Sequence, residues 1–396
     1  MRGASDDKSA HDLLSACGVD TFVIAMLTRV TAANDPAFSE RAHPGSVGLP
    51  GELTSSEASS DLCVRDLAFQ LLDAERARVA RGEIARGSWQ VMDNRLRAHI
   101  LPLLGDLPAH RVDAAAGQRL IDRLGDQGLS STTLSQYVVL LRKVLMHGVL
   151  TGVLHELPRL PKVKVRSRPR GSFSVAEYRQ LASAARALRG QAHPILGTLD
   201  AGDRFWIARD LLYMPDEMSW LIRWMVNTFV RPSDVKLVRH KHVDVVRGRQ
   251  LYLRLRLPET KRHGQPVVSL RPAVHVYEAL LRQRRSEGLA APDDYLFLPR
   301  VKDRNQALAV LNFFFKWVPQ QTGLETGPLG QTRTLYCLRH TAITLRLLYG
   351  QGIDMLTLAR NARTSVNMIE RFYASTLSGE MNVDLLQSRR GRKSGP

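Results

Sequence analysis

The sequence predicts an α+β protein that is mostly helical: a small all-helical domain, then a larger helical domain that contains a three-stranded antiparallel sheet. Two patterns support this prediction. Apolar residues recur every three or four positions over most of residues 63–160 and again after residue 173, which is the period of amphipathic helices. Between residues 243 and 270 the pattern changes to that of short β-strands. At 396 residues the chain is long enough for two or three domains with real cores.

Residues 1–62 form an N-terminal segment that we expect to be variable and only partly ordered. His11 to Ala33 could form one amphipathic helix, whereas Asn34 to Ser60 is rich in Pro, Gly and Ser, as linkers are. The segment holds four basic and nine acidic residues, so its net charge is −5. The whole chain carries +18, which leaves +23 for residues 63–396. The positive charge of residues 63–396 favours a polyanionic partner, because Lys and Arg that bind phosphates release the counterions held by those phosphates. A basic protein that is merely soluble is the alternative.

Residues 63–160 are expected to form a compact helical domain. Helical spacing runs over residues 63–81, 88–99, 113–126 and 130–150, and Gly and Pro punctuate these segments. Any small helical domain would give the same pattern, so this signal alone indicates no particular function.

Residues 161–172 alternate basic residues with small ones and contain two prolines. Proline disfavours helix and the like charges repel one another, so we expect an extended linker. A linker between two DNA-gripping domains would lie along phosphates, and a solvated tether is the alternative. The candidate DNA-binding residues are Lys162, Lys164, Arg166, Arg168 and Arg170.

Residues 173–385 are expected to form the larger domain. A capping box, Ser174-x-x-Glu177, predicts the start of its first helix. Strands are predicted at residues 243–246, 251–257 and 267–270. Lys261 lies in the loop between the second and third strands, where a turn lysine in water is the simplest interpretation. The remainder is predicted to be helical to about Leu386, and residues 386–396 form a basic tail.

Two helices near the end of the chain carry the most informative residues. Arg339 opens an amphipathic helix, and Tyr373 lies near the end of another helix that Ser365 can cap. An Arg on a rigid element suits a phosphate, which it can bind with two parallel hydrogen bonds. A Tyr hydroxyl nearby could attack that phosphate and form an ester. Taken singly, a core aromatic residue and a solvated arginine are the simpler interpretations.

Four segments in sequence order resemble the motifs of the tyrosine recombinase (phage integrase) family. Thr228-Phe-Val-Arg-Pro-Ser-Asp234 resembles the box of the first arginine, and Thr260-Lys261 resembles the hairpin lysine. Tyr336-Cys-Leu-Arg339-His340-Thr341 resembles the helix box, and Tyr373 stands at the position of the nucleophile. The resemblance covers residues 173–385 well and residues 63–160 loosely. It implies a SAM-like core-binding domain at 63–160 and a catalytic domain at 173–385.

The resemblance also implies a chemistry: site-specific DNA recombination through a 3′-phosphotyrosyl intermediate, serving integration or excision of a mobile element. Tyr373 would be the nucleophile, and Lys261 would protonate the leaving 5′ oxygen, with Arg262 and His263 as competitors for that role. Asp234 and His340 would hold the reacting groups in place. The groups that contact the phosphate would be Arg231, Arg339, Tyr336 and Thr364. Because the ester conserves the bond energy, neither a cofactor nor a metal is expected.

Three positions depart from the family pattern. Tyr336 stands where His is usual, and Arg363 and Thr364 stand where Gly-His or Gly-Trp is usual. Tyr336 and Thr364 keep a neutral hydroxyl donor, but neither can transfer a proton as His does. The alternatives are therefore a catalytically impaired DNA-binding protein of the same fold and, with less support, a type IB topoisomerase. The expected partners are double-stranded DNA, further copies of the chain forming a tetramer on DNA, and accessory DNA-bending proteins.

The remaining sequence features argue against other classes of protein. Cys17, Cys63 and Cys337 have no metal-ligand spacing and leave an odd thiol, which argues against a disulfide framework. The longest apolar run near the start, residues 21–27, is too short to cross a bilayer and lacks the basic leader of a signal peptide. No phosphate-binding loop, dinucleotide fingerprint or HExxH motif is present. We therefore expect a soluble cytoplasmic protein, associated with the nucleoid when bound to DNA.

Overall fold

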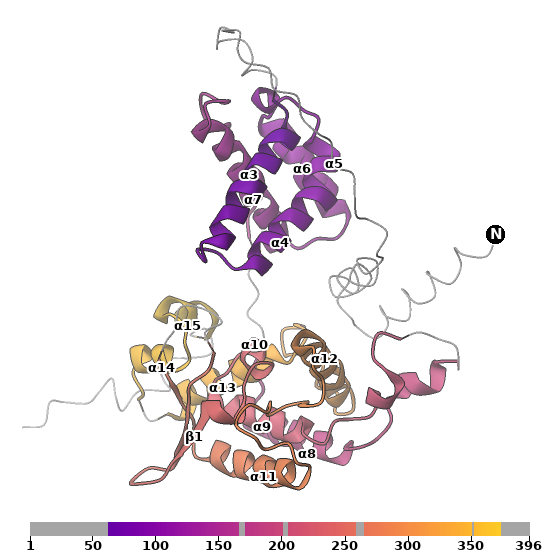
Figure 1. Ribbon diagram of the computed structural model, residues 1–396, viewed down its shortest axis with the longest axis vertical. Coiled ribbons are helices and arrows are strands. Elements are labelled where there is room, and N and C mark those ends of the chain that lie inside the picture. The colour runs from indigo at the N-terminus through magenta and orange to yellow at the C-terminus, as the bar shows by residue number, and fades with distance from the viewer. Residues whose placement is uncertain (1–61, 166–170, 201–204, 259–264, 351, 374–396) are drawn as a thin grey trace, which may run out of the picture. The chain divides into compact units, whose positions relative to one another are not determined.

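The computed structural model describes residues 62–165, 171–200, 205–258, 265–350 and 352–373. These residues fall into two compact units, with the division between Arg168 and Pro169. Figure 1 shows a first unit made of helices and a second unit in which a small sheet lies at one side of a group of helices. The described part of the chain is thus mostly helical with a three-stranded antiparallel sheet, which confirms the predicted fold class.

The first unit is a helical bundle around one core. Its core is built from Leu67, Leu96, Leu141 and other apolar residues that are fully buried. Asp113 and Ser130 cap two of the helices by accepting the backbone amides of Ala116 and Thr133. The elements are α3 (Val64–Ala80), α4 (Arg86–Arg95), η1 (Leu96–Ile100), α5 (Leu101–Leu104), η2 (Ala109–Arg111), α6 (Ala114–Asp126) and α7 (Ser131–Leu150).

One helix of this unit differs from the sequence prediction. A helix was expected over residues 88–99, yet α4, η1 and α5 follow one another without a break from Arg86 to Leu104. The turn Leu96–Ile100 is a π turn that comes just before Pro102. A wider turn at this place accommodates a proline, which lacks an N–H and crowds the preceding carbonyls.

The second unit contains the sheet and the helices from α8 to α15. Strands β1 (Val243–Val246), β2 (Tyr252–Leu255) and β3 (Val267–Val268) pair in the order β1-β2-β3, all antiparallel. The helices are α8 (Val175–Ala187), η3 (Pro194–Thr198), η4 (Arg209–Leu211), α9 (Met218–Thr228), α10 (Pro232–Val235), η5 (His240–His242), α11 (Pro272–Ser286), α12 (Arg304–Gln320), α13 (Tyr336–Tyr349), α14 (Met355–Asn361) and α15 (Val366–Tyr373).

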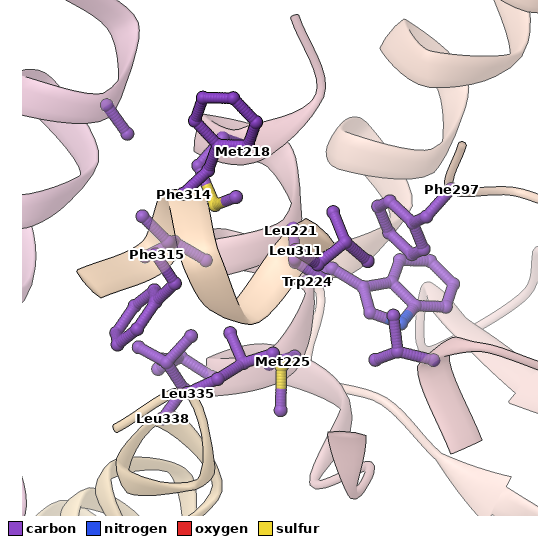
Figure 2. Packing of buried hydrophobic residues seen from close by; sticks show 14 of the residues in the cluster. Met218, Leu221, Trp224, Met225, Phe297, Leu311, Phe314, Phe315, Leu335 and Leu338 are labelled. Atoms are coloured by element: carbon purple, nitrogen blue, oxygen red, sulfur yellow. The ribbon is translucent and has the colours of Figure 1, made fainter. Parts of the chain in front are cut away.

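Helix α9 lies at the centre of the second unit and contacts α8, α11, α12 and α13. Figure 2 shows Trp224 of this helix beside Phe297, and the two ring centroids are 6.1 Å apart. Phe315 of α12 lies next to the start of α13, where Leu338 is buried, and Phe314 lies beside Met218 of α9. This packing fixes the C-terminal end of α9 and the N-terminal end of α13, the two places from which the candidate arginines project.

A smaller apolar cluster joins the last three helices. Ile343 of α13, Leu358 of α14 and Ile369 of α15 are buried together with Phe229 and Tyr373. The cluster therefore holds the end of α15 against α13 and against the residues that follow α9.

Candidate active site

Arg231 lies at a sharp turn between two helices. Helix α9 ends at Thr228, and Phe229 takes up a left-handed conformation (φ 58°) that redirects the chain. Arg231 is then extended and precedes α10, and its backbone amide donates to Asp234 Oδ2 over 2.8 Å. Its side chain reaches across the unit, where Nη2 donates to the carbonyl oxygen of Arg363. The turn thus directs this guanidinium toward the α14–α15 connection.

Arg339 lies in the first turn of α13 and is almost fully buried. Its Nη1 donates to the carbonyl oxygen of Phe229, and its Nη2 donates to that of Ala362. Burial lowers the pKa of this guanidinium, and the positive charge of Arg231 lowers it further. An arginine guanidinium is not deprotonated in proteins, so the group still carries its charge at neutral pH. Arg339 is a fixed, charged donor.

The connection between α14 and α15 brings the two arginines together. The amide of Arg363 donates to Arg360 O over 3.0 Å, and the amide of Thr364 donates to Ala359 O over 2.9 Å. This is the double hydrogen-bond pattern of a Schellman motif, in which the residue after the C-cap is left-handed. Arg363 occupies that position with φ 52°. Arg339 and Arg231 bind the carbonyls of the consecutive residues 362 and 363, so their guanidinium groups are neighbours.

Tyr373 ends α15 beside this pair and is buried, with 6% of its surface exposed. The centroid of its ring lies 4.8 Å from that of His340, which in turn lies 5.3 Å from that of Tyr336. Burial raises the pKa of Tyr373 to about 12, and the charges of Arg339 and Arg231 oppose this shift without cancelling it. The phenol is therefore neutral at physiological pH in the protein without DNA.

The other predicted site residues stand as follows. Tyr336 is half-buried one helical turn before His340, and it interacts electrostatically with both Arg339 and Tyr373. Thr364 is half-buried, and among the described residues its backbone amide, not its hydroxyl, makes a hydrogen bond. Lys162 and Lys164 are exposed in the first unit. The residues that lie outside the described ranges are Lys261, Arg166, Arg168 and Arg170, together with Arg262 and His263.

Arg363 is a site residue to which sequence reasoning assigned no role. Only 3% of its surface is exposed, and within the described chain none of its three guanidinium nitrogens has a hydrogen-bond partner. Its Nη1 lies 3.6 Å from Asp234 Oδ1, which is close enough for an ion pair but too long for a hydrogen bond. The available signal was a charged residue at the position where the family usually has Gly. A left-handed non-glycine residue costs about 1 kcal/mol.

Two other features are absent from the described residues. No group of three or more His, Cys, Asp or Glu side chains there could hold a metal ion. In the same ranges, no helix has both the length and the apolar character needed to span a bilayer.

Comparison with known proteins gives similarities in structure alone. No protein-family model matches the sequence, and no curated protein matches it. The integrase of transposon Tn1549, bound to circular intermediate DNA, superposes with a TM-score of 0.57 at 15% identity, covering 83% of this chain and 100% of that one. A lambda integrase dimer bound to a COC′ core site gives 0.52 at 14% identity, covering 83% and 80%. A lambda integrase tetramer bound to a Holliday junction gives 0.52 at 15%, covering 75% and 77%.

Both neighbours are tyrosine recombinases. Because the superposition spans most of this chain and most of theirs, the protein has the tyrosine recombinase fold, as the sequence motifs led us to expect.

Proposed function

We propose that the protein is a site-specific DNA recombinase that cleaves and rejoins DNA through a 3′-phosphotyrosyl intermediate, for integration or excision of a mobile element. The observation that carries this proposal is the meeting of Arg231 and Arg339 on consecutive carbonyls of the turn before α15, the helix that ends in Tyr373. Charged donors fixed beside a tyrosine hydroxyl are what nucleophilic attack on a phosphodiester needs. The fold shared with two integrases supports the same conclusion.

The proposed reaction consists of two phosphoryl transfers. In the first, the Tyr373 oxygen forms a bond to phosphorus and its proton passes to water, while the bond from phosphorus to the 5′ oxygen breaks. Lys261 donates a proton to that leaving oxygen and becomes neutral. In the second, the 5′ hydroxyl of another DNA end gives its proton to Lys261 and attacks the same phosphorus, which displaces the Tyr373 oxygen; that oxygen takes a proton from water. No phosphate bond is lost overall, so the exchange needs no energy from a nucleotide.

The role of the arginines in this scheme is electrostatic. The pentacoordinate transition state carries more negative charge on its nonbridging oxygens than the diester does, so fixed donors bind it more tightly than the ground state. Removing one such donor typically costs about 3–4 kcal/mol of activation free energy. Asp234 orients Arg231 by accepting its backbone amide, and His340 packs against the ring of Tyr373.

The proposed partner is double-stranded DNA, bound by both units and by the basic linker residues between them. Lys162 and Lys164 are exposed, and the body of the chain carries the large positive charge that phosphate contacts use. Strand exchange joins two duplexes and four strands, so we propose assembly into a tetramer on DNA. The lambda integrase neighbours include a dimer on a core site and a tetramer on a Holliday junction. Accessory DNA-bending proteins would act on the same duplex.

Two features favour a second candidate function. Burial holds Tyr373 neutral, and Tyr336 supplies no proton-transferring imidazole. These features would suit a DNA-binding protein of the same fold whose catalysis is impaired. The two candidates differ in whether a covalent protein–DNA adduct forms, which one experiment can decide.

The test is covalent trapping of the protein on DNA, and it does not require the target sequence to be known. The full-length protein is incubated with a pool of nicked duplexes of randomised sequence, and SDS-resistant adducts are captured and sequenced. The parent protein and Tyr349→Phe should both form adducts, since Tyr349 is 66% exposed at the far end of α13. Tyr373→Phe should bind DNA and form none. DNA binding without adducts in the parent protein would favour the impaired DNA-binding protein.

A further inference from the structure

Arg363 is a buried cation that the protein leaves unsatisfied. Among the described residues, its Nε, Nη1 and Nη2 atoms are all buried without a hydrogen-bond partner, and so is Nη1 of Arg231. A buried donor that lacks a partner is costly, and a charged one costs more. Four unpartnered guanidinium nitrogens on two residues therefore point to an acceptor that binds there. The acceptor must offer several oxygens, because the donors belong to two different side chains.

The charges around this place have the same implication. Arg231, Arg339 and Arg363 are three positive groups, and Asp234 is the carboxylate among them, which leaves a net +2 within the described residues. Asp234 is 1% exposed and shared: one of its oxygens accepts the Arg231 amide, and the other lies 3.6 Å from Arg363. An excess of buried positive charge is costly, and a bound anion would offset that cost.

The backbone conformation at Arg363 argues against a purely structural role for this arginine. The Schellman turn places residue 363 in the left-handed region, where glycine fits without strain. The protein instead holds an arginine there and buries it, although Asp234, its ion-pair partner among the described residues, lies beyond hydrogen-bond distance. Residues kept in strained conformations are typical of functional sites.

We propose that Arg363 is a third phosphate-binding arginine, which donates to a nonbridging oxygen of the scissile phosphodiester alongside Arg231 and Arg339. This inference rests on the recombinase function proposed above. The neutral donors Tyr336 and Thr364 cannot supply positive charge, and Arg363 supplies it in their place. Among the described residues, Arg363 raises the net charge beside the phosphate from +1 to +2, and this favours the phosphorane, which carries more negative charge than the diester.

The test compares Arg363→Gln with Arg360→Gln in the full-length protein. Arg360 lies one residue before the end of α14 and is exposed, so its variant loses the same charge near the same turn. On a nicked duplex recovered from the trapping pool, Arg363→Gln should form the covalent adduct about 100- to 1,000-fold more slowly in single turnover. Arg360→Gln should stay within about twofold of the parent protein, because exposed charges act weakly on a buried site.

A second variant distinguishes an Arg363 that contacts the phosphate from an Arg363 that only supports the fold. Arg363→Gly suits the left-handed turn and should fold, and it leaves a space of guanidinium size. Millimolar methylguanidinium should restore part of the adduct rate of Arg363→Gly, which a purely structural role would not allow. Adduct formation by Arg363→Gln at the parent rate, or an Arg363→Gly variant that is slow but not rescued, would overturn the inference and leave the recombinase function standing.

Anion binding at Arg363 can also be tested without catalysis, which matters if the parent protein forms no adduct. Thermal unfolding is then measured in sodium sulfate and in sodium chloride of equal ionic strength. Sulfate should raise the unfolding midpoint of the parent protein and of Arg360→Gln more than that of Arg363→Gln, because bound anion stabilises the folded state. General salting effects are common to all three proteins. Equal sulfate increments in the three proteins would exclude an anion site at Arg363.

Discussion

The ionisation of Tyr373 is the main energetic question at the scale of single residues. A phenol attacks phosphorus only as its proton leaves, yet burial holds the pKa of Tyr373 at about 12 in the protein without DNA. Arg339 and Arg231 act in the opposite direction. A bound phosphodiester would add negative charge next to the phenol, so proton removal must be coupled to the attack itself and not precede it.

The raised pKa of Tyr373 predicts how folding stability depends on pH. The folded state holds the proton more tightly than the unfolded state, in which the pKa is about 10. The stabilisation is therefore fully present below pH 10 and is lost as the pH rises toward the folded value of about 12. At pH 10.5 the parent protein should have lost roughly 1 kcal/mol that Tyr373→Phe, which cannot ionise, retains.

Urea unfolding of both proteins at pH 8.5 and pH 10.5 measures this difference directly. Tyr277, whose pKa burial also raises to about 12, is present in both proteins and cancels in the comparison. The same loss of stability in parent and variant between the two pH values would mean that Tyr373 ionises as a solvated phenol does.

Sequence reasoning reached the residues that stand in motifs and missed one that depends on backbone conformation. Arg231, Arg339 and Tyr373 could be named because they stand in segments that resemble the motifs of the tyrosine recombinase family. Arg363 could not be assigned a role, because its burial follows from the left-handed turn and from the ion pair with Asp234, which is far away in sequence. Thr364 was expected to orient phosphate, and this stays a prediction: within the described chain its hydroxyl makes no hydrogen bond.

At the scale of elements, the small sheet supports the turn that holds the arginines. Asn361, the last residue of α14, accepts the amide of Val268 over 2.7 Å and donates to the carbonyl of Val268 over 3.0 Å. These two hydrogen bonds join α14 to β3. Ala362, which follows directly, provides the carbonyl that binds Arg339. The side chain of Asn361 thus links the edge strand β3 to the turn that holds the arginines.

Asn361→Ala should therefore weaken both the fold and the reaction. Loss of two hydrogen bonds should lower the free energy of unfolding by about 1–3 kcal/mol. The single-turnover adduct rate should fall, because the carbonyls at residues 362 and 363 lose their support, while DNA affinity stays the same. Asn312→Ala is the control, since among the described residues the Asn312 side chain bonds within α12, to Leu308 O. Equal adduct rates for the two variants would show that β3 does not support the site.

The strands show that alternation in the sequence does not predict where strand pairing ends. Alternation predicted strands at residues 251–257 and 267–270, whereas β2 and β3 cover only Tyr252–Leu255 and Val267–Val268. Alternation continues beyond the ladder because Leu251 and Leu257 pack against the main core without strand partners. Pairing depends on the neighbouring strand, and β3 meets β2 at only two residue pairs. The predicted hairpin lysine, Lys261, lies outside the described residues.

At the scale of the whole molecule, charge and the division into two units determine how DNA would be bound. The chain divides between Arg168 and Pro169, inside the basic segment that we predicted to be a linker. Linker charges that lie along phosphates would tie both units to one duplex, and each unit would raise the effective concentration of the other. The predicted domain limits at residues 62, 160, 172 and 385 stay predictions.

Salt dependence tests whether the linker contacts DNA. Each neutralised phosphate contributes about −0.9 to the slope of log affinity against log salt, so Lys162→Gln with Lys164→Gln should make the slope less steep by about 1.8. The control is Arg282→Gln with Arg285→Gln: both residues are exposed on α11, which Figure 1 shows at the opposite end of the second unit from α15. Fluorescence anisotropy across a salt series gives both slopes. Equal slopes for the two double variants would argue for a solvated tether.

The most direct test of the account is to find the amino acid that becomes joined to DNA. The trapped adduct is digested with nuclease and trypsin, and the modified peptide is identified by mass spectrometry. Cleavage after Arg371 and Arg389 yields a peptide in which Tyr373 is the single tyrosine, while Tyr336 lies on the separate peptide that ends at Arg339. The account predicts a nucleotide attached through its 3′ phosphate to the peptide that contains Tyr373. A nucleotide on the peptide that contains Tyr336, or on any other residue, would contradict it.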